Sequence, residues 1–475
     1  MKSWMKWTAT VCVAGLLTAC GGDSHTTTGN IAEEAQAKGY TALLAAATKA
    51  NLVGALTNAN ANLTVFAPTD AAFNALATQL GFANATAMVT ALTPAQLTSI
   101  LQYHLLPGIK NASALQSGGA TQSTAYTFPA NATSKATLSL NTTSGVKLTD
   151  AALTVATVTS ANLNASNGII HQVDKVLVPP GVLNLLQTAQ VNPGTFSALG
   201  AAVGKAGTGV VDALSVANAN LTLFAPTNTA FGTLASQLGF ADASAMVTAL
   251  SASDLTKILQ FHLLPGAKAA AALTAGPADT AYTFGTSAAK ATLSTTGGVK
   301  ITDAALTQAS VAAADVNAVN GIIHVVDKVL VPPGVLNIVQ MAQVNPATFS
   351  TLVNNVVSAG LKDILSGAGP FTLFAPTNVA FTGAPTLTAT ELPFVLKYHV
   401  LGSQVLSTGI TFGTPVATIN TNTRAGAVVA AQTITINSNP LAITDKTATA
   451  APIEATDVRA SNGVIHVISK VLIPN

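Results

Sequence analysis

One phrase occurs three times in this chain and constrains its fold more than any other feature. It reads NGIIHQVDKVLVPPG from Asn167, NGIIHVVDKVLVPPG from Asn320 and NGVIHVISKVLIPN from Asn462. Other phrases precede each copy in a constant order, such as LTVFAPTDAAF from Leu63 and LQYHLLPG from Leu101, and they recur about 150 residues apart. Solenoid repeats are only roughly 20 to 50 residues long, so a repeat of this length is a whole domain. The 475 residues therefore predict three tandem domains of one fold.

The segments between the repeats predict how the domains are joined. Each begins with paired prolines, at Pro179 and at Pro332, and continues with apolar residues at helical spacing. The third domain is shorter, because Phe374 and His399 are 25 positions apart where the matching residues of the other domains are 38 apart, and we expect it to lack one helix. The predicted ranges are 38–180 for domain 1, 181–193 for a linker helix, 194–333 for domain 2, 334–346 for a second linker helix and 347–475 for domain 3.

The first residues have the pattern of an export signal. A charged start, MKSWMK, is followed by an apolar stretch and by LTAC, which ends at Cys20. This pattern resembles a bacterial lipobox, at which the signal is cut and the cysteine is lipidated. It predicts a lipoprotein signal peptide at 1–19, lipidation of Cys20 and a flexible tether at 20–37. An ordinary signal peptide with an incidental Cys20 is the alternative.

The same region predicts where the protein resides. Gly21, in place of an aspartate after the cysteine, indicates an outer-membrane lipoprotein that faces the periplasm or the cell surface. The only other cysteine, Cys12, would leave with the signal peptide. The mature chain would then have neither a disulfide nor a thiol nucleophile, although its compartment permits disulfides.

Charge is scarce in this chain and balanced in sign. Charged residues make up 8% of it, against roughly 25% in an ordinary globular protein. The net charge of +2 includes Lys2 and Lys6 of the leader, so the remainder carries 18 basic and 18 acidic residues. Without a basic run, the sequence gives no reason to expect binding to nucleic acid. The surface should be mostly neutral, with hydroxyl and amide groups.

Each repeat mixes strand and helix patterns. The β-rich run NLTVFAP ends at a proline, and Thr69 or Asp70 is placed to cap the helix that follows. Thr93 is the expected cap of a second helix, with Pro94 at its first position. Helices and strands do not alternate regularly, which favours an α+β fold over a doubly wound parallel sheet.

Six of the seven histidines occupy two repeated positions. The first set follows apolar residues at the i, i+3, i+4 and i+7 spacing of a helix, which places it on the buried face. The second set lies in a strand that is apolar on both faces. Histidines hydrogen-bonded inside the core are the interpretation we favour, and a catalytic or metal-binding role is the alternative. The sets are His104, His262 and His399, then His171, His324 and His466.

The acids near these histidines do not form a constant catalytic set. Asp174 follows His171 by three positions, whereas Ser469 follows His466. Asp150 lies in a Thr-Asp pair that recurs in all three repeats, as a turn-forming pair would. The chain has no Gly-x-Ser-x-Gly, His-Glu-x-x-His or Cys-x-x-Cys motif. We therefore expect no enzymatic activity, no cofactor and no metal site. A hydrolase that joins His171, Asp150 and a serine in a deep cleft is the least favoured alternative.

Three markers together carry a resemblance to a known family. TVFAPT, the YH that precedes LLPG, and NGIIHVVDKVLVP resemble the motifs of the fasciclin domain, an extracellular module, over residues 39–474. The resemblance implies a compact α+β body with a seven-stranded β-wedge and a layer of helices. It also implies a role in adhesion to matrix, polysaccharide or another cell, generally without enzyme activity.

The resemblance also suggests binding residues. In animal members of the family, the Tyr-His pair has been associated with integrin recognition. Phe261 departs from that pair, because it lacks the tyrosine hydroxyl. The positions that match it are Tyr103 and His104, Phe261 and His262, and Tyr398 and His399.

The sequence thus predicts three tandem fasciclin-like domains of α+β class, each a β-wedge or sandwich with packed helices. We expect a non-enzymatic, lipid-anchored, extracytoplasmic adhesion protein whose partner is a cell-surface protein, a matrix protein or a polysaccharide, and whose membrane contact is the lipid on Cys20. Three linked copies would add avidity where single sites are weak. A carrier of a small apolar ligand in a pocket of the wedge is the alternative.

Overall fold

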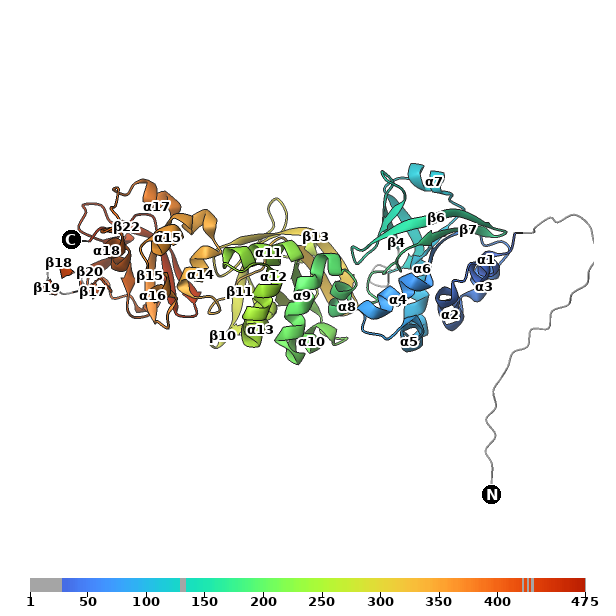
Figure 1. Cartoon of the computed structure of the whole chain (residues 1–475), viewed down its shortest axis with the longest axis horizontal. Helices are drawn as coiled ribbons and strands as arrows, with labels where there is room; N and C mark the ends of the chain where they lie inside the picture. Colours follow the sequence, from blue (N-terminus) through green and yellow to red (C-terminus); the bar gives the residue numbers. More distant parts are fainter. Residues whose placement is uncertain (1–27, 129–133, 421–422, 425–426, 429–430, 475) are drawn as a thin grey trace, which may run out of the picture.

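The computed structural model describes residues 28–128, 134–420, 423–424, 427–428 and 431–474. The predicted signal peptide and Cys20 lie outside these residues. Three bodies follow one another along the longest axis of the molecule, with domain 1 at one end and domain 3 at the other (Figure 1). The prediction of three tandem α+β domains is confirmed.

A seven-stranded sheet with the same topology forms the centre of each domain. In domain 1 its order is β2-β1-β7-β6-β5-β4-β3. The neighbours β1 and β7 are parallel, and the other neighbours are antiparallel. The two strands come from the repeated phrases FAP and NGIIH, and they pair Leu63 with Gly168 and Phe66 with His171. The strands are β1 Leu63–Pro68, β2 Leu105–Pro107, β3 Thr121–Thr127, β4 Lys135–Asn141, β5 Lys147–Thr149, β6 Val155–Ala165 and β7 Gly168–Val173.

All but one of the helices cover one face of this sheet, and their ends follow the predicted caps. Thr69 caps α4 through Ala72, and Thr93 caps α6 in a reciprocal capping box with Gln96. The choice left open between Thr69 and Asp70 is therefore resolved in favour of Thr69. The helices of domain 1 are α1 Ile31–Ala37, α2 Thr41–Lys49, α3 Val53–Thr57, α4 Asp70–Gln79, α5 Ala85–Ala91, α6 Pro94–Tyr103 and α7 Ala112–Ser117.

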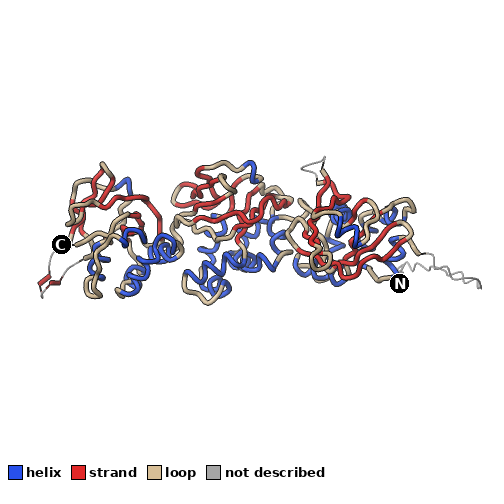
Figure 2. Tube along the Cα trace, turned by 90° about the horizontal axis from the view of Figure 1, so that it is seen from above, coloured by secondary structure: helices blue, strands red, loops and turns tan. Residues whose placement is uncertain are grey.

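Domain 2 repeats this arrangement, with strands on one side and helices on the other (Figure 2). Its sheet has the order β10-β11-β12-β13-β14-β8-β9. Its helices are α8 Leu185–Gln190, α9 Pro193–Ala206, α10 Thr208–Ser215, α11 Asn228–Gln237, α12 Ala243–Ala249, α13 Ala252–Phe261 and the 3-10 turn η2 Ala270–Ala272. Its strands are β8 Leu221–Pro226, β9 Leu263–Pro265, β10 Gly276–Phe284, β11 Ser287–Ser294, β12 Lys300–Thr302, β13 Gln308–Ala318 and β14 Gly321–Val326.

Domain 3 keeps the sheet, in the order β16-β15-β23-β22-β21-β20-β17, beside a two-stranded pair, β18 and β19. Its helices are α14 Ile338–Gln343, α15 Pro346–Ser358, α16 Lys362–Ser366, α17 Asn378–Thr382, α18 Leu392–Tyr398 and the 3-10 turn η3 Ser407–Gly409. Its strands are β15 Phe371–Pro376, β16 Val400–Leu401, β17 Pro415–Ala417, β18 Thr423–Arg424, β19 Ala427–Val428, β20 Thr433–Ser438, β21 Leu441–Thr444, β22 Ala451–Ala460 and β23 Gly463–Ile468.

The helix that domain 3 was expected to lack is the counterpart of α5 and α12. Between α17 and α18 the described chain forms no helix. In domains 1 and 2, Lys49 and Lys205 donate from Nζ to backbone carbonyls at the ends of α5 and α12. Ser358 stands at the matching position of domain 3. The lysine and the helix whose end it caps are therefore absent together.

The predicted tether is wrong from residue 30 onward. Residues Ile31–Ala37 form α1, whose Asn30 cap makes a capping box with Glu33. Ile31 is buried, and its N–H donates to Oδ1 of Asn167 at 2.9 Å. Burial of its apolar side chain fixes α1 to domain 1, so this part of the predicted tether belongs to the folded domain.

The two predicted linker helices are present within 181–193 and 334–346, as α8 and α14, but each belongs to the domain that follows it. α8 and α14 occupy the same position in domains 2 and 3 as α1 does in domain 1, since the N–H groups of Leu185 and Ile338 donate to Asn320 and Asn462 at 2.9 Å. Both side chains are fully buried. Each helix is therefore the first element of the following domain rather than a connection between two bodies.

At each joint between domains, the turn that follows the paired prolines is hydrogen-bonded to the next domain. Between domains 1 and 2, the N–H of Gly181 donates to the carbonyl of Asn317 at 2.9 Å, and the N–H of Val319 donates to that of Leu183 at 2.8 Å. Between domains 2 and 3, the matching bonds join Gly334 to Arg459 at 3.1 Å and Ser461 to Leu336 at 2.8 Å. The two joints are thus built in the same way.

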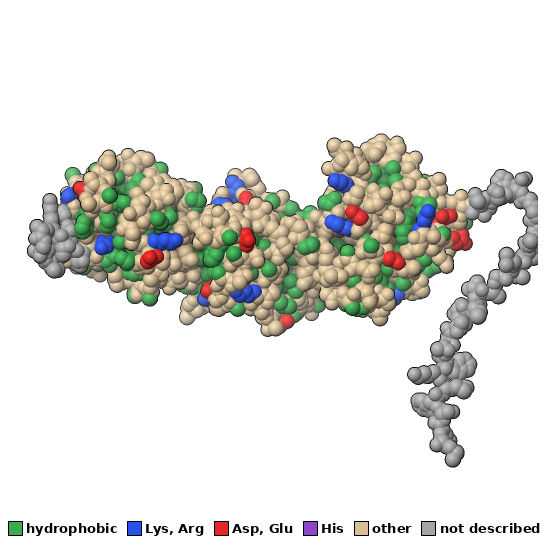
Figure 3. Space-filling model, in the orientation of Figure 1, with side chains coloured by type: hydrophobic (Ala, Val, Ile, Leu, Met, Phe, Trp, Pro, Cys, Tyr) green, Lys and Arg blue, Asp and Glu red, His purple; other side chains and the backbone are tan. Residues whose placement is uncertain are grey.

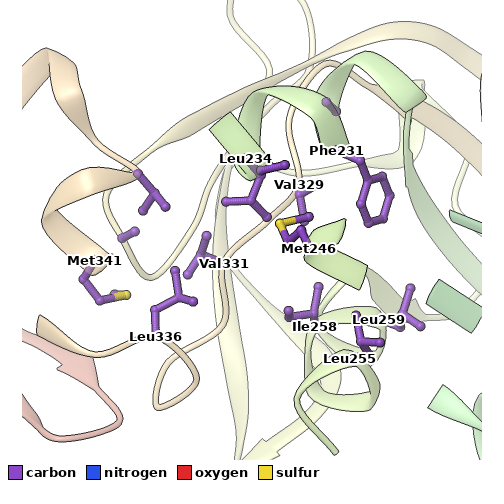
Figure 4. Close-up of a cluster of buried hydrophobic side chains, with 14 of the residues drawn as sticks. Phe231, Leu234, Met246, Leu255, Ile258, Leu259, Val329, Val331, Leu336 and Met341 are labelled. Carbon is purple, nitrogen blue, oxygen red and sulfur yellow. The ribbon is translucent and has the colours of Figure 1, made fainter. Parts of the chain in front are cut away.

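Side chains reinforce both joints. The amide of Asn192 donates to the carbonyls of Ala152 and Leu153 in the preceding domain, and Asn345 does the same to Ala305 and Leu306. The helix-side core is continuous from domain 2 into domain 3, and Figure 4 shows part of it. There the side chains of α11, α12 and α13 lie near those of the segment that leads to α14, whose Met341 is also drawn.

Candidate functional site

The histidine of each Tyr-His pair lies in the core and joins two parts of its domain. His104 follows the last residue of α6 and is 1% exposed. Its Nδ1 donates to the carbonyl of Ile100 at 2.8 Å, and its Nε2 accepts from the N–H of Leu177 at 2.9 Å. His262 and His399 make the corresponding two bonds in their own domains. This histidine thus ties the end of a helix to the segment that follows the last strand of the sheet.

These bonds require the neutral imidazole, because one ring nitrogen donates and the other accepts. Burial lowers the pKa of His104, His262 and His399 from 6.5 to about 4. The three side chains are therefore uncharged at neutral pH and serve as structural connections.

The aromatic partner of each pair is also buried. The hydroxyl of Tyr103 donates to the carbonyl of Thr137 at 2.8 Å, and that of Tyr398 donates to Thr433 at the same distance. Burial raises the pKa of both phenols. Phe261 is fully buried and has no hydroxyl to donate. Binding of a partner by these six side chains stays a prediction, and the structure gives them contacts within the core.

The strand histidines are likewise fully bonded. His171 donates from Nε2 to the carbonyl of Lys110 at 2.8 Å, accepts at Nδ1 from the N–H of Asn162 at 3.3 Å, and lies against the ring of Phe66. His324 and His466 make the same contacts in domains 2 and 3. The phrase that is repeated from Asn167, Asn320 and Asn462 therefore places the same packed histidine in each of the three domains.

The recurring aspartate closes a loop beside the first histidine set. Asp150 is 4% exposed and accepts from Ala152, from Thr154 twice, and from Val178. Val178 directly follows Leu177, whose N–H binds His104. The histidine and the aspartate therefore accept hydrogen bonds from neighbouring backbone N–H groups. Burial, opposed by these hydrogen bonds, raises the pKa of Asp150 from 3.8 to about 6.

The three copies of this aspartate differ in one respect. Asp303 repeats the bonds of Asp150, and its pKa is also raised by burial to about 6. Asp445 is buried as well, but Lys470 donates to it at 3.0 Å. Hydrogen bonds from Thr447, Ile473 and this lysine outweigh burial, so the pKa of Asp445 is lowered.

Neither a metal-ion cluster nor the joint His171–Asp150 site of the hydrolase alternative is found in the described part of the chain. It contains no group of three or more histidine, cysteine, aspartate or glutamate side chains able to hold a metal ion. His171 and Asp150, which the hydrolase alternative requires together, each use their polar atoms in bonds within the domain.

Three enclosed cavities among the described residues are small. One in domain 1, lined by α1, Val65, His104 and other apolar side chains, measures about 20 Å³. Two others, one in each of domains 1 and 2, measure about 10 Å³. Each is about the size of one water molecule or less, so none could hold the small apolar ligand of the carrier alternative.

A larger space lies between domains 1 and 2. This interdomain crevice has a volume of about 340 Å³ and is lined by residues of both domains, from Phe128 and Pro180 on one side to residues 314–317 on the other. Sequence reasoning missed it, because two bodies form it together and no motif of either domain marks it. The only hint is the glycine of the phrase VPPG, which shapes the joint beside the crevice.

Comparison with known proteins identifies the family. The model of the fasciclin domain matches residues 38–179, 194–332 and 347–474. The chain therefore belongs to the fasciclin-domain family, as three seven-stranded wedges covered by helices and joined in a row already indicate.

Individual relatives share parts of the chain. Transforming growth factor-beta-induced protein ig-h3 of Sus scrofa is 27% identical over 334 residues, which are 67% of this chain and 41% of that protein. Protein sll1483 of Synechocystis sp. is 35% identical over 148 residues, 29% of this chain and 74% of that one. Periostin of Homo sapiens is 26% identical over 253 residues, 51% of this chain and 27% of periostin. The chain thus spans less than half of the ig-h3 protein.

One solved structure is also similar. A fasciclin domain pair from the insect cell adhesion molecule fasciclin I covers 58% of this chain and 96% of its own, at 17% sequence identity and a TM-score of 0.31. In the described residues of this chain, no helix has both the length and the apolar character needed to cross a membrane.

Proposed function

We propose that this chain is a non-enzymatic adhesion protein that acts outside the cytoplasm. The observation that carries the proposal is the row of three like domains, joined by two like joints, with histidines and aspartates used for internal bonds. Charged side chains are sparse on the face drawn in Figure 3, where most of the surface is backbone, neutral polar or hydrophobic. Such a surface offers many weak hydrogen bonds and little electrostatic steering, and this suits contact with neutral surfaces at several points at once.

The partner we propose is a cell-surface protein, a matrix protein or a polysaccharide. Membership of the fasciclin-domain family supports this role, since the usual role of the family is adhesion. The test is binding of the full chain to immobilised glycans, matrix proteins and whole cells. Retention of the chain on at least one class of surface, without chemical breakdown of that surface, supports adhesion. The absence of retention on every class of surface refutes adhesion.

We further propose that a lipid on Cys20 anchors the protein to a membrane, most directly the outer membrane. The support is the LTAC sequence that ends at Cys20, and Gly21 after it. α1 begins only eleven positions after Cys20, so the anchor would hold domain 1 close to the membrane and place domain 3 farthest from it. Mass spectrometry of the membrane fraction should show a mature chain that begins at a lipid-modified Cys20. A mature chain that begins elsewhere, or at an unmodified Cys20, would contradict the anchor.

A further inference from the structure

The interdomain crevice is built by hydrogen bonds that fix both of its walls. On the side of domain 1, the hydroxyl of Tyr126 donates to the carbonyl of Pro180 at 3.2 Å. Gly181, at a φ of 72°, lies so close to the ring of Phe128 that an added Cβ would be 2.3 Å from it. The bond from Gly181 to Asn317 joins this wall to domain 2 at 2.9 Å. The crevice is thus formed before any ligand arrives, which lowers the cost of binding.

The wall of domain 2 is equally fixed. It is the bulge of β13, where Asp315 adopts a φ of 62°. Oδ1 of Asp315 accepts from the N–H of Ala270 at 2.8 Å, and the amide of Asn317 donates to the carbonyl of Asp315 at 2.9 Å. A carboxylate has about four acceptor sites, so Asp315, an exposed lining residue of the crevice, keeps acceptor capacity beyond this bond.

The crevice combines an apolar floor with a polar rim. Phe128, Leu153 and Val316 are buried or half-buried lining residues. Lys135 and Thr137 are exposed on the domain 1 side, opposite Asp315. The ammonium of Lys135 donates to Ala125 and Thr127, and it has a third N–H to offer. The lining thus carries charged groups of both signs, Lys135 against Asp315 and the buried Asp150, rather than a patch of one sign.

We propose that this crevice binds a neutral oligosaccharide segment. A pyranose ring has an apolar C–H face that matches the floor, and its hydroxyls both donate and accept, as Lys135, Thr137 and Asp315 require. The volume of about 340 Å³ lies at the lower end of the range of small-molecule sites, roughly 300 to 1,000 Å³, and suits a short segment rather than a folded partner. The inference rests on the proposed adhesion and names the partner class, a neutral polysaccharide.

The second joint provides a matched control. Arg459 occupies the position of Asn317, and Lys290, paired with Asp279 at 2.7 Å, occupies that of Thr137. Ala314, exposed on the rim of the crevice, has Thr456 as its counterpart. A tryptophan at either position adds the same bulk beside a similar joint, but only Ala314→Trp would fill the proposed site.

The experiment titrates the full chain with cellotetraose, maltotetraose and mannotetraose, followed by calorimetry and by ligand-observed NMR. We expect at least one of them to bind, with an affinity that Ala314→Trp weakens about tenfold or more, that Lys135→Ala weakens less, and that Thr456→Trp leaves unchanged. Circular dichroism of each variant checks that it is folded.

Three results would overturn the proposal. The first is that no neutral tetrasaccharide binds at concentrations up to about 10 mM. The second is that a tetrasaccharide binds but Ala314→Trp does not weaken its binding. The third is that only a sulfated oligosaccharide or the zwitterion Gly-Gly binds. Failure of the crevice proposal is distinct from failure of the adhesion proposal. If other faces of the three-domain chain carry adhesion, the Ala314→Trp chain would still be retained on cells or matrix.

Discussion

Acid should unfold the third domain before the other two. Burial lowers the pKa of His399 from 6.5 to about 4, so the folded state binds fewer protons than the unfolded state between these values. The stabilisation is complete above pH 6.5 and is lost as the pH falls toward 4. At roughly 1.4 kcal/mol for each pH unit between the two pKa values, the loss is about 3 kcal/mol.

In domains 1 and 2 a second group opposes this loss. Burial raises the pKa of Asp150 and Asp303 from 3.8 to about 6. Their contribution to the free energy of unfolding has the opposite sign, since it is complete below pH 3.8 and lost as the pH rises through 6. Acidification therefore stabilises each of these domains by about 3 kcal/mol through its aspartate. Asp445 of domain 3 has a lowered pKa and adds to the loss below pH 3.8.

Urea unfolding of each domain at pH 7.5 and pH 4.5 tests this reasoning. A chain with Cys12 and Cys20 replaced by serine can carry one buried reporter cysteine in each domain, at Ala67, Ala225 or Ala375, all fully buried. An acid-tolerant disulfide reagent then reports when each becomes exposed. The midpoint of domain 3 should fall by far the most.

A matched variant sharpens the test. Asp303→Asn removes the opposing acid from domain 2, which should then become as acid-sensitive as domain 3. The reasoning is refuted if domains 1 and 2 lose as much stability on acidification as domain 3 does in the unaltered chain.

Three further predictions follow from particular contacts. His262→Ala leaves the carbonyl and N–H that the ring binds unpaired in the core, and should cost domain 2 about 4 kcal/mol in urea unfolding. Gly181→Ala brings a methyl group against an aromatic ring at a positive φ and should change the angle between domains 1 and 2 in X-ray scattering, whereas Gly108→Ala, at a similar φ of 80° but in open space, should leave the angle unchanged. Asn345→Ala removes two bonds across the second joint, worth about 1 kcal/mol each, and should broaden the distance distribution between spin labels in domains 2 and 3.

The sequence predicted the features that repeat within each domain. The helical spacing before His104 identified its buried face, and Thr93 with Pro94 located the start of α6, because capping and periodicity are local signals. α1 was missed, although Asn30 and Glu33 form the same capping box as the starts of α8 and α14. Its neighbours are small and polar, and only burial of one face against distant residues makes it a stable helix.

The joints and the crevice could not be predicted in this way. The bond from Gly181 to Asn317 joins residues 136 positions apart, and nothing local specifies such a pair. The linker prolines indicated a boundary but not that the chain there would pair with the next domain. Relative domain placement depends on many weak contacts between surfaces, which leave no periodic pattern in the sequence.

The central claim is that the three-domain chain adheres to a surface through several weak contacts at once. The most direct test measures dissociation of the full chain from polysaccharide, matrix and cell surfaces prepared at increasing partner density. Our account predicts that dissociation slows by about a hundredfold or more as density rises and several contacts form together. Dissociation that does not depend on density, or no retention on any of these surfaces, would contradict it.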